Sequence, residues 1–414
     1  MEEIKEIIEI RENKEDNRKQ NRSHFIKGML FGILLFVMTL SVIIFIVGNN
    51  TNRTIALDPT SKMQEILNIL DFHSVNEFDI DIMTESMFMG FLFGVGDPYT
   101  SYMNRETLAA FRESAEGRYA GIGVRVQIDQ DDNRIQILQV FTGGPSDIAL
   151  LEPGDKIIKV DGVDVSGANF EDAVSMMRGT PGTRVTLTIF REFNNQTFER
   201  EIIRDEVEVP TVEHRMLDDE VGYIRITNFD RQTHPQFMHA LGNLKQQGMQ
   251  GLVIDVRNNP GGLLDSVVRI TGELIPEGTV VYTVDSRGNR DVSRSNDRQL
   301  GLPLAVLVNE NSASASEVLA GAVRDTNSGV LVGNRTFGKG VVQSLFPLSD
   351  GSGIKVTIAR YYTPGGYSIH GEGILPDILV ETDRETSMRV MSLAPSEDEQ
   401  LQAAIGSIRQ EISQ

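Results

Sequence analysis

The chain has 414 residues, 40% of them apolar, which is enough for two or three folded domains and excludes wholesale disorder. Its formal net charge of -20 disfavours a nucleic-acid partner, because an acidic surface repels phosphate backbones. The absence of cysteine excludes thiol nucleophiles, disulfides and cysteine-based metal sites. None of the six histidines stands at metal-ligand spacing, so neither a metal nor a cofactor is expected.

The first predicted element is a membrane anchor over residues 28–48, a run without any charged side chain. As a helix this run spans about 30 Å, the thickness of the hydrocarbon core of a bilayer. Its length, and the lack of a convincing small-residue cleavage site, favour an uncleaved anchor over a buried core helix or a signal peptide. Basic residues crowd its N-terminal flank, against Arg53 alone close on the other side: Arg18, Lys19, Arg22 and Lys27. The positive-inside rule therefore predicts a cytoplasmic tail over residues 1–27 and an extracytoplasmic catalytic part, held at the cell membrane by a single pass.

A helical segment, bounded at residues 55–105, follows the anchor. Apolar residues recur at helical spacing between Met63 and Leu70, and residues 87–93 form a second apolar patch. So short a segment cannot bury this surface by itself, so it must pack on the rest of the chain or on another subunit. We expect it to assemble a homodimer, because a large exposed apolar surface is a liability unless a partner covers it.

Between residues 117 and 205 the pattern changes to short strands separated by turns. Strands are expected over residues 122–126, 134–140, 154–160 and 184–190, with a helix over 169–177. Asp161-Gly162 is a strong signal for a two-residue hairpin turn. This pattern predicts a small α+β or barrel-like module.

After Val221 the pattern becomes that of an α/β domain. Apolar strands are expected over residues 221–226, 251–256 and 304–308, and helices over residues 235–247, 263–275 and 314–325. Such alternation predicts a largely parallel sheet covered on both faces. The last thirty residues are polar and charged, which favours a peripheral helix or a tail.

Two strand–turn–helix units in this part could carry chemistry. The first contains Gly261-Gly262, and the second contains Ser314 at the start of a helix. Backbone N–H groups at a helix N-terminus have no intrahelical partners, and an acyl-transfer enzyme needs such donors where the oxyanion develops. The alternative is structural, since Ser314-x-x-Glu317 is also a capping-box pattern.

A third segment places Lys339 between two glycines. Gly333 to Lys339 matches the first positions of a phosphate-binding loop, but Gly340 stands where Ser or Thr should follow, and a strand rather than a helix comes next. Burial would lower the pKa of this lysine and let its neutral amine accept a proton from a serine. Gln343, four residues on, could orient it. The alternative is a surface lysine in a glycine turn.

Together these motifs resemble the carboxyl-terminal processing (tail-specific) serine peptidase family. The resemblance rests on residues 255–262, 312–322, 335–343 and 362–366, and covers roughly residues 85 to 382. It implies an α/β peptidase core similar to the crotonase and Clp-protease folds over residues 206–384, with a PDZ domain inserted over residues 106–205 and a C-terminal tail over residues 385–414.

The resemblance also implies a role for each motif residue. Ser314 would be the nucleophile, Lys339 the general base and Gln343 its orienting partner. The backbone N–H groups of Gly262 and Ala315 would form the oxyanion hole. Glu317 would keep a capping role and also touch the site.

In the module identified as a PDZ domain, the resemblance implies a site for peptide C-termini. The successive N–H groups of Gly121, Ile122 and Gly123 would form a nest for the carboxylate, beside a groove that binds the peptide by strand addition. Arg178 stands where the family has an arginine that couples docking to the active site. Unfolded or flexible C-termini of exported proteins would be the substrates.

Two other functions fit part of the sequence. A catalytically silent PDZ adaptor at the membrane would have lost Ser314 or Lys339, and both are present. A crotonase-type acyl-CoA enzyme would use the same oxyanion donors, but the anchor and the PDZ module argue against a CoA substrate.

Overall fold

The computed structural model describes residues 59–167, 170–217, 220–296, 298–390 and 393–414. The predicted cytoplasmic tail (1–27) and anchor (28–48) lie outside these residues. Within them, no helix is both long and apolar enough to cross a membrane. The chain divides into two compact units, one up to Met83 and one from Thr84 onward.

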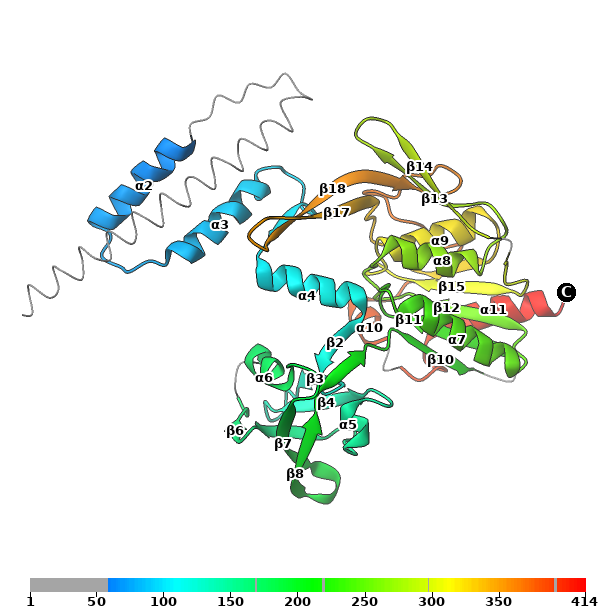
Figure 1. The fold of residues 1–414 in the computed structure, drawn as a ribbon. Helices are drawn as coiled ribbons and strands as arrows, with labels where there is room; N and C mark the ends of the chain where they lie inside the picture. The colour runs from blue at the N-terminus through cyan, green and yellow to red at the C-terminus, as the bar shows by residue number, and fades with distance from the viewer. Residues whose placement is uncertain (1–58, 168–169, 218–219, 297, 391–392) are drawn as a thin grey trace, which may run out of the picture. The chain divides into compact units, whose positions relative to one another are not determined.

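Helices α2 (Pro59–His73) and α3 (Ile80–Phe93) follow each other in the segment for which helices are predicted (Figure 1). Both leave large apolar side chains in solvent. In α2, Phe72 is 83% exposed, and in α3, Phe91 and Phe93 are 72% and 87% exposed. Leu67 of α2 is buried, but much of the apolar surface of the two helices stays exposed in the described chain.

The peptidase-like core contains a six-stranded sheet in the order β10-β11-β12-β15-β16-β19. All neighbours in this sheet are parallel except β10, which is antiparallel to β11. The strands are β10 (Val212–Met216), β11 (Val221–Ile226), β12 (Gly251–Asp255), β15 (Leu304–Val308), β16 (Val330–Gly333) and β19 (Ile378–Leu379). The prediction of a largely parallel sheet is confirmed.

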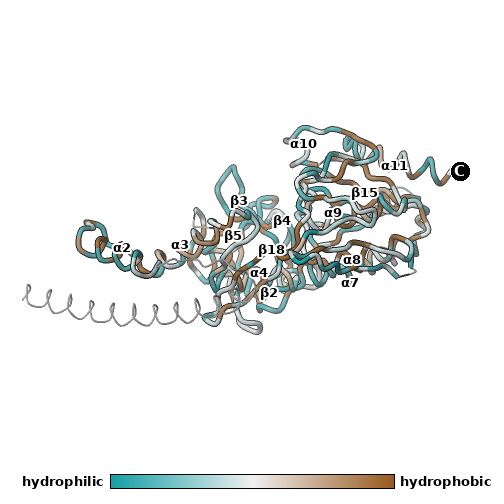
Figure 2. Tube along the Cα trace, turned by 90° about the horizontal axis from the view of Figure 1, so that it is seen from above, coloured by the Kyte–Doolittle hydropathy of each residue, from teal (hydrophilic) through white to brown (hydrophobic). Residues whose placement is uncertain are grey.

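Helices cover both faces of this sheet, because successive residues of a buried strand point to opposite sides. Ile254 and Val306 face the core shared with α7 (Thr233–Gln246), α8 (Leu264–Gly272) and α9 (Ala315–Asp325). Val253 and Leu307, one residue away, face α11 (Glu399–Ile412). Both faces of β15 are therefore buried. The strand is a hydrophobic segment of the trace in Figure 2.

The last thirty residues, for which a peripheral helix or a tail is predicted, contain α11, which is more buried than that prediction implies. This helix packs on the sheet through Leu401, Ala404, Ile405 and Ile408. These residues follow the i, i+3, i+4, i+7 spacing of an amphipathic helix, but the charged residues around them hide the stripe in the sequence.

A second sheet joins segments from both sides of the inserted module. Strand β1 (Ser101–Met103) pairs with β18 (Gly353–Tyr362), which also pairs with β13 (Thr279–Asp285) and β17 (Val341–Pro347). Strand β14 (Arg290–Arg294) closes its far edge. Because β1 precedes the small module and β18 follows it, the module is an insertion in the core.

The inserted module is entered through α4 (Arg105–Glu116) and the strand pair β2 (Arg118–Gly121) and β9 (Asp205–Glu208). Its main sheet runs β3-β4-β5-β7-β8, with β6 paired to β5. The predicted hairpin turn is confirmed, since Asp161 and Gly162 both have positive φ between paired Val160 and Val163. The remaining elements are β3 (Val124–Ile128), β4 (Ile135–Val140), α5 (Pro145–Ile148), β5 (Lys156–Val160), β6 (Val163–Asp164), α6 (Phe170–Met177), β7 (Arg184–Arg191), η1 (Glu192–Asn194) and β8 (Gln196–Ile203).

A buried arginine ties α11 to the loop after β12. The guanidinium of Arg257 contacts the carboxylates of Asp255 (2.6 Å) and Asp398 (2.7 Å), and all three side chains are nearly inaccessible to solvent. Burial alone would raise the pKa of Asp255, but the adjacent Arg257 holds it below its ordinary value. Asp398 also caps α11 by accepting from the N–H of Leu401.

Asp398→Ala should therefore destabilise the chain strongly. Removing one partner leaves the charge of Arg257 incompletely compensated, which costs about 3–5 kcal/mol, and the lost cap adds about 1 kcal/mol. The measurement is the urea unfolding midpoint. Asp265→Ala is the matched control, because it breaks an exposed pair with Arg269 and should cost at most about 1 kcal/mol. Equal midpoints for the two variants would contradict the assigned role of Asp398.

Candidate active site

The two predicted strand–turn–helix units lie side by side, because β12 and β15 are parallel neighbours and their carboxyl ends meet at one edge of the sheet. The carbonyl of Asn259 in the first loop accepts from the N–H of Ala313 (3.1 Å) and from the hydroxyl of Ser316 (2.9 Å) in the second. The approach is closest at Gly261, where a β-carbon would lie 2.8 Å from that of Ser314. Only glycine fits there, so the glycine pair lies directly against the serine.

Ser314 precedes α9 in an unusual backbone conformation. Its φ of 55° and ψ of -112° fall in a region that side chains disfavour, at a cost of about 1–3 kcal/mol. Ser312 and Ser316 are fully buried, and their hydroxyls donate to the carbonyls of Val256 and Asn259. Of the three serines in this motif, Ser314 alone is partly exposed.

Glu317 joins the serine loop to the lysine loop. Its buried carboxylate accepts from the N–H groups of Ser314 (2.9 Å), Gly338 (2.7 Å) and Lys339 (2.8 Å), and from the hydroxyl of Thr336 (2.7 Å). Burial raises the pKa of Glu317, and these four donors oppose the rise. The capping contact expected at Ser314 is present, and the same carboxylate also holds the backbone of Lys339.

Lys339 is half-buried in the loop before β17. Burial lowers the pKa of its amine, and the charge of Lys355 lowers it further, while Asp97 and Glu317 oppose the shift. Its Nζ lies 5.0 Å from the ring centre of Tyr99, within cation–π range. The direction of the shift is the one that a neutral base requires.

Gln343 lies on β17, at the point where the pairing of β17 with β18 shifts register. Its amide donates to the backbone carbonyl of Tyr99 rather than to Lys339. The structure therefore brings Lys339 and Gln343 to the same tyrosine, one to its ring and one to its backbone. Tyr99 is held in turn by Asp97, whose carboxylate accepts from the N–H of Tyr99 (3.0 Å) and from the hydroxyl of Thr100 (2.6 Å).

A buried tyrosine that no sequence motif predicts lies against the loop of Lys339. Tyr361 is 2% exposed, and its hydroxyl donates to the carbonyl of Lys339. Burial and Glu317 raise the pKa of Tyr361 well above its ordinary value, while the nearby hydroxyl of Ser314 opposes the rise. Tyr361 directly precedes the 362–366 motif, but only the pairing of β18 with β17 brings it to the site.

The predicted oxyanion donors, Gly262 and Ala315, belong to the two loops that meet at Ser314. Gly262 has a φ of 139°, and a β-carbon there would lie 2.1 Å from the carbonyl oxygen of Phe229. Ala315 is the first residue of α9, and its N–H is among those without an intrahelical partner. The nitrogen of Ala315 would lie 3.0 Å from a β-carbon on Gly261. The two loops therefore bring both predicted donors next to the serine.

In the inserted module, the predicted carboxylate nest links β2 to β3. Gly121 ends β2, Ile122 is buried, and Gly123 has a φ of 78°. Among the described residues, β3 pairs with β4 alone, so its other edge is open to a strand. This is the geometry in which a peptide binds by adding a strand.

Arg178 follows α6 and connects two other parts of the structure. Its guanidinium bonds to the carboxylate of Glu113 on α4 and lies 5.3 Å from the ring centre of Tyr119 on β2. Arg178, which is predicted to couple docking to catalysis, thus contacts β2, the strand before the nest, and α4, the helix that joins the module to the core.

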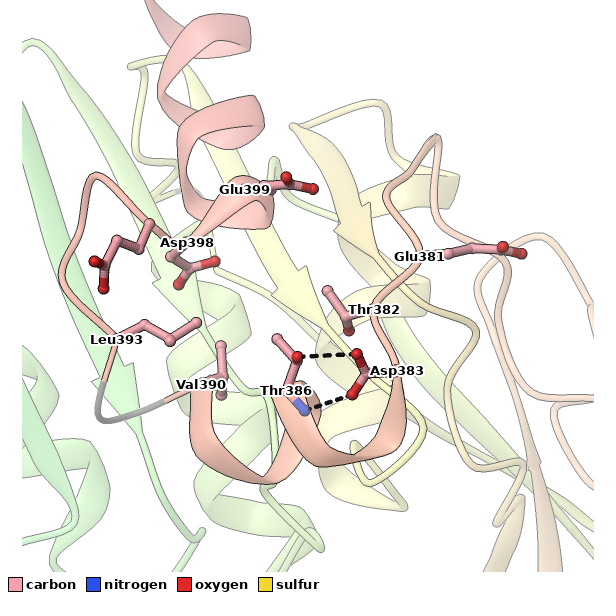
Figure 3. Close-up of a pocket in the computed structure, with 9 residues that line it drawn as sticks. Glu381, Thr382, Asp383, Thr386, Val390, Leu393, Asp398 and Glu399 are labelled. Atoms are coloured by element: carbon pink, nitrogen blue, oxygen red, sulfur yellow. Dashed lines mark hydrogen bonds between the residues drawn. The ribbon is translucent and has the colours of Figure 1, made fainter.

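A separate pocket of about 280 Å³ lies between α10 (Arg384–Arg389) and the start of α11 (Figure 3). Its lining includes five carboxylates, and Asp383 accepts from the N–H and hydroxyl of Thr386. None of the predicted site residues lines it. Within the described ranges, no group of three or more His, Asp or Glu side chains has the arrangement of a metal site.

The sequence and the fold are similar to those of known proteins. Residues 220–380 match peptidase family S41, and residues 111–190 match the PDZ domain. A carboxyl-terminal-processing protease of Synechocystis sp. is 38% identical over 314 residues, which cover 75% of this chain and 73% of that protein. A carboxy-terminal-processing protease of Bartonella bacilliformis is 34% identical over 366 residues, covering 86% and 82%. A solved structure from Bacteroides fragilis with the S41 label shares the fold at 16% identity, with a TM-score of 0.51 and coverage of 83% and 94%.

Proposed function

The chain belongs to the carboxyl-terminal processing proteases of peptidase family S41 and is a serine peptidase, and from this premise we propose that a Ser314–Lys339 dyad cleaves the C-terminal regions of exported proteins. Ser314 Oγ attacks the scissile carbonyl while the neutral amine of Lys339 takes its proton. The N–H groups of Gly262 and Ala315 stabilise the oxyanion. Lys339 then gives the proton to the leaving amine, and water hydrolyses the acyl-enzyme by the same route. Gln343 orients the amine of Lys339 once the amide of Gln343 no longer bonds to the carbonyl of Tyr99.

One observation supports this dyad above the others. A single buried carboxylate, that of Glu317, accepts from the backbone N–H groups of both Ser314 and Lys339. The two residues are 25 positions apart in the chain. A capping box alone explains the contact with Ser314 but not the one with Lys339. The arrangement is suited to holding a nucleophile and its base at a fixed separation.

The inserted PDZ domain would select the substrate. A C-terminal carboxylate would bind in the nest of Gly121, Ile122 and Gly123, and the preceding residues would add as a strand to the open edge of β3. A docked peptide would change the position of Arg178, and the bond between Arg178 and Glu113 would pass that change to α4. Extended, unstructured C-termini fit this mode, because a folded terminus cannot add as a strand.

The test is to digest an unfolded substrate and map the cuts by mass spectrometry. We expect cleavage near the C-terminus, and a severalfold lower rate for the same peptide with an amidated C-terminus. Amidation removes the charge that the nest binds, and a charge-assisted hydrogen bond contributes about 1.5–3 kcal/mol. Equal rates for the acid and the amide would refute docking through the carboxylate, and no cleavage of either would refute the dyad.

We further propose that residues 28–48 anchor the chain in the cell membrane, with residues 1–27 in the cytoplasm and the catalytic part outside. The support is the uncharged run and the basic residues that precede it. The full chain should stay in carbonate-washed membranes, and removal of residues 1–48 should release it. Equal retention of both forms would contradict the anchor.

A homodimer assembled through the helical segment is part of the same proposal. Phe91 and Phe93 are largely exposed, which supports a surface that a second copy covers. Confinement to a membrane also raises the effective concentration of like chains. Light scattering on a chain beginning near Asn52 should give a dimer mass, and one beginning near Gly117 a monomer mass. A monomer for the longer chain at micromolar concentration would count against the dimer, and a dimer for the shorter chain would move the interface elsewhere.

A further inference from the structure

The side chain of Tyr119 on β2 bonds to the residue that directly follows the proposed carboxylate nest of the PDZ domain. The hydroxyl oxygen of Tyr119 lies 3.2 Å from the N–H of Val124, which donates to it, and donates in turn to the carbonyl of Val124 at 3.3 Å. Tyr119 is on β2, and Val124 is the first residue of β3. A side chain thus spans the loop that contains Gly121, Ile122 and Gly123.

The groups that Tyr119 occupies are those that a peptide would use. Val124 pairs with Val140, while the N–H of Phe141 donates to the carbonyl of Gly123. Since successive residues of a strand direct their N–H and C=O groups to alternate sides, the N–H and C=O of Val124 point away from β4, toward the open edge. Strand addition and carboxylate binding both require that edge.

The surroundings of the phenol resemble those of a bound anion. Burial raises the pKa of Tyr119, and the N–H groups of Val124 and Gly123 together with the guanidinium of Arg178 oppose the rise. Each of these three groups would also favour a carboxylate. A β-carbon at Gly121 would lie 2.7 Å from the ring of Tyr119, so the glycine makes room for the tyrosine.

We propose that the hydroxyl of Tyr119 is an internal competitor for the carboxylate nest, and that a substrate C-terminus docks only by displacing it. The hydroxyl satisfies the N–H and C=O of Val124 when no peptide is bound, and so weakens binding of every C-terminus. Weak C-termini are then excluded, which makes Tyr119 a specificity-determining residue for this chain. The inference rests on the proposed docking function of the nest.

Displacement would also release Arg178. The ring of Tyr119 lies beneath the Arg178 guanidinium at 5.3 Å, and the same guanidinium bonds to Glu113. When the ring leaves, Arg178 loses its cation–π partner and is free to contact the incoming carboxylate. A single side chain therefore links the occupancy of the nest to the position of Arg178.

Tyr119→Phe tests this inference, because it removes the hydroxyl and keeps the ring. Binding is measured by fluorescence polarisation with the full chain in detergent, in a Ser314→Ala background that prevents cleavage. The probe is a fluorescein-labelled decapeptide ending in Ser-Leu-Ala-Ala, with either a carboxylate or an amide at its C-terminus. We expect Tyr119→Phe to bind the carboxylate peptide about 5- to 30-fold more tightly, since one or two hydrogen bonds no longer compete, and to gain less affinity for the amide, which adds to the same edge without a carboxylate.

Two further variants make the result decisive. Tyr119→Leu removes the hydroxyl without relying on the aromatic ring and should shift affinity in the same direction. Tyr102→Phe removes a hydroxyl that bonds to Glu85 outside the PDZ domain and should bind as the parent does. Selective binding of the carboxylate peptide by the parent, with no gain in either Tyr119 variant, would overturn the competitor and leave the proposed function intact. Failure of all proteins to prefer the carboxylate over the amide would overturn the docking function and this inference with it.

Discussion

Ser314→Ala should abolish cleavage of an unfolded casein, with a loss of about 10³- to 10⁶-fold in kcat, the range found when a nucleophile is removed from a serine peptidase. The hydroxyl is the only one of its motif that is partly exposed, and it sits on the strained residue at the start of α9. No neighbouring group can replace it, because the other two serines direct their hydroxyls into the interior.

Those two serines are the matched controls. Ser312→Ala and Ser316→Ala should keep measurable activity and lose about 0.5–1.5 kcal/mol of stability, since each removes one hydrogen bond to a buried carbonyl that keeps a backbone donor. Activity and unfolding midpoint are measured on the same preparations. Full activity in Ser314→Ala would exclude the proposed mechanism, and inactivity of all three variants at normal stability would leave the nucleophile unassigned.

Activity should rise with pH as the amine of Lys339 loses its proton, because only the neutral amine can act as a base. Burial places the pKa of Lys339 below its ordinary value of 10.5, so the rise should be centred below that pH. The pH profile of kcat/KM for an uncharged peptide measures it. Lys339→Arg should be inactive throughout, since a guanidinium keeps its proton at every accessible pH.

Stability should respond to the same group in the same sense as activity, increasing with pH. The folded state binds the proton of Lys339 less tightly than the unfolded state, so its contribution to stability increases with pH between the two pKa values. Below that window the charged amine opposes folding. Lys339→Met, which keeps the length and removes the charge, should therefore be inactive yet no less stable at pH 7. An active Lys339→Arg variant would point to another base, with His370 the next residue to replace.

Strands of the core were predictable because they are buried on both faces. The bounds of β11 and β15 agree with the predicted ranges, since a continuous apolar run between turns leaves little choice. Strand β3 begins two residues later than predicted, because the positive φ of Gly123 delays the extended conformation. The burial of helix α11 was not predicted, because charged residues on its solvent side alternate with the apolar residues that pack on the sheet.

The motifs located the loops of the site but not what surrounds them. Gln343 bonds to Tyr99, which lies 244 residues earlier, and nothing in the local pattern of either segment reports the contact. The same holds for Tyr361, which reaches Lys339 only because β18 pairs with β17. Periodicity and spacing describe neighbours along the chain, whereas these contacts depend on the folded sheet.

The insertion also sets the order in which a newly made chain can finish folding. Thr100 accepts from the N–H of Thr357, 257 residues later, so the segment that carries Tyr99 waits for most of the chain to be synthesised. At typical translation speeds that interval is on the order of ten to fifty seconds, long enough for the PDZ domain to fold first as a unit. The contact of Arg257 with Asp398 forms later still, because Asp398 follows Thr357 in the chain. The PDZ domain can therefore be folded while the segments that form the proposed active site are still apart.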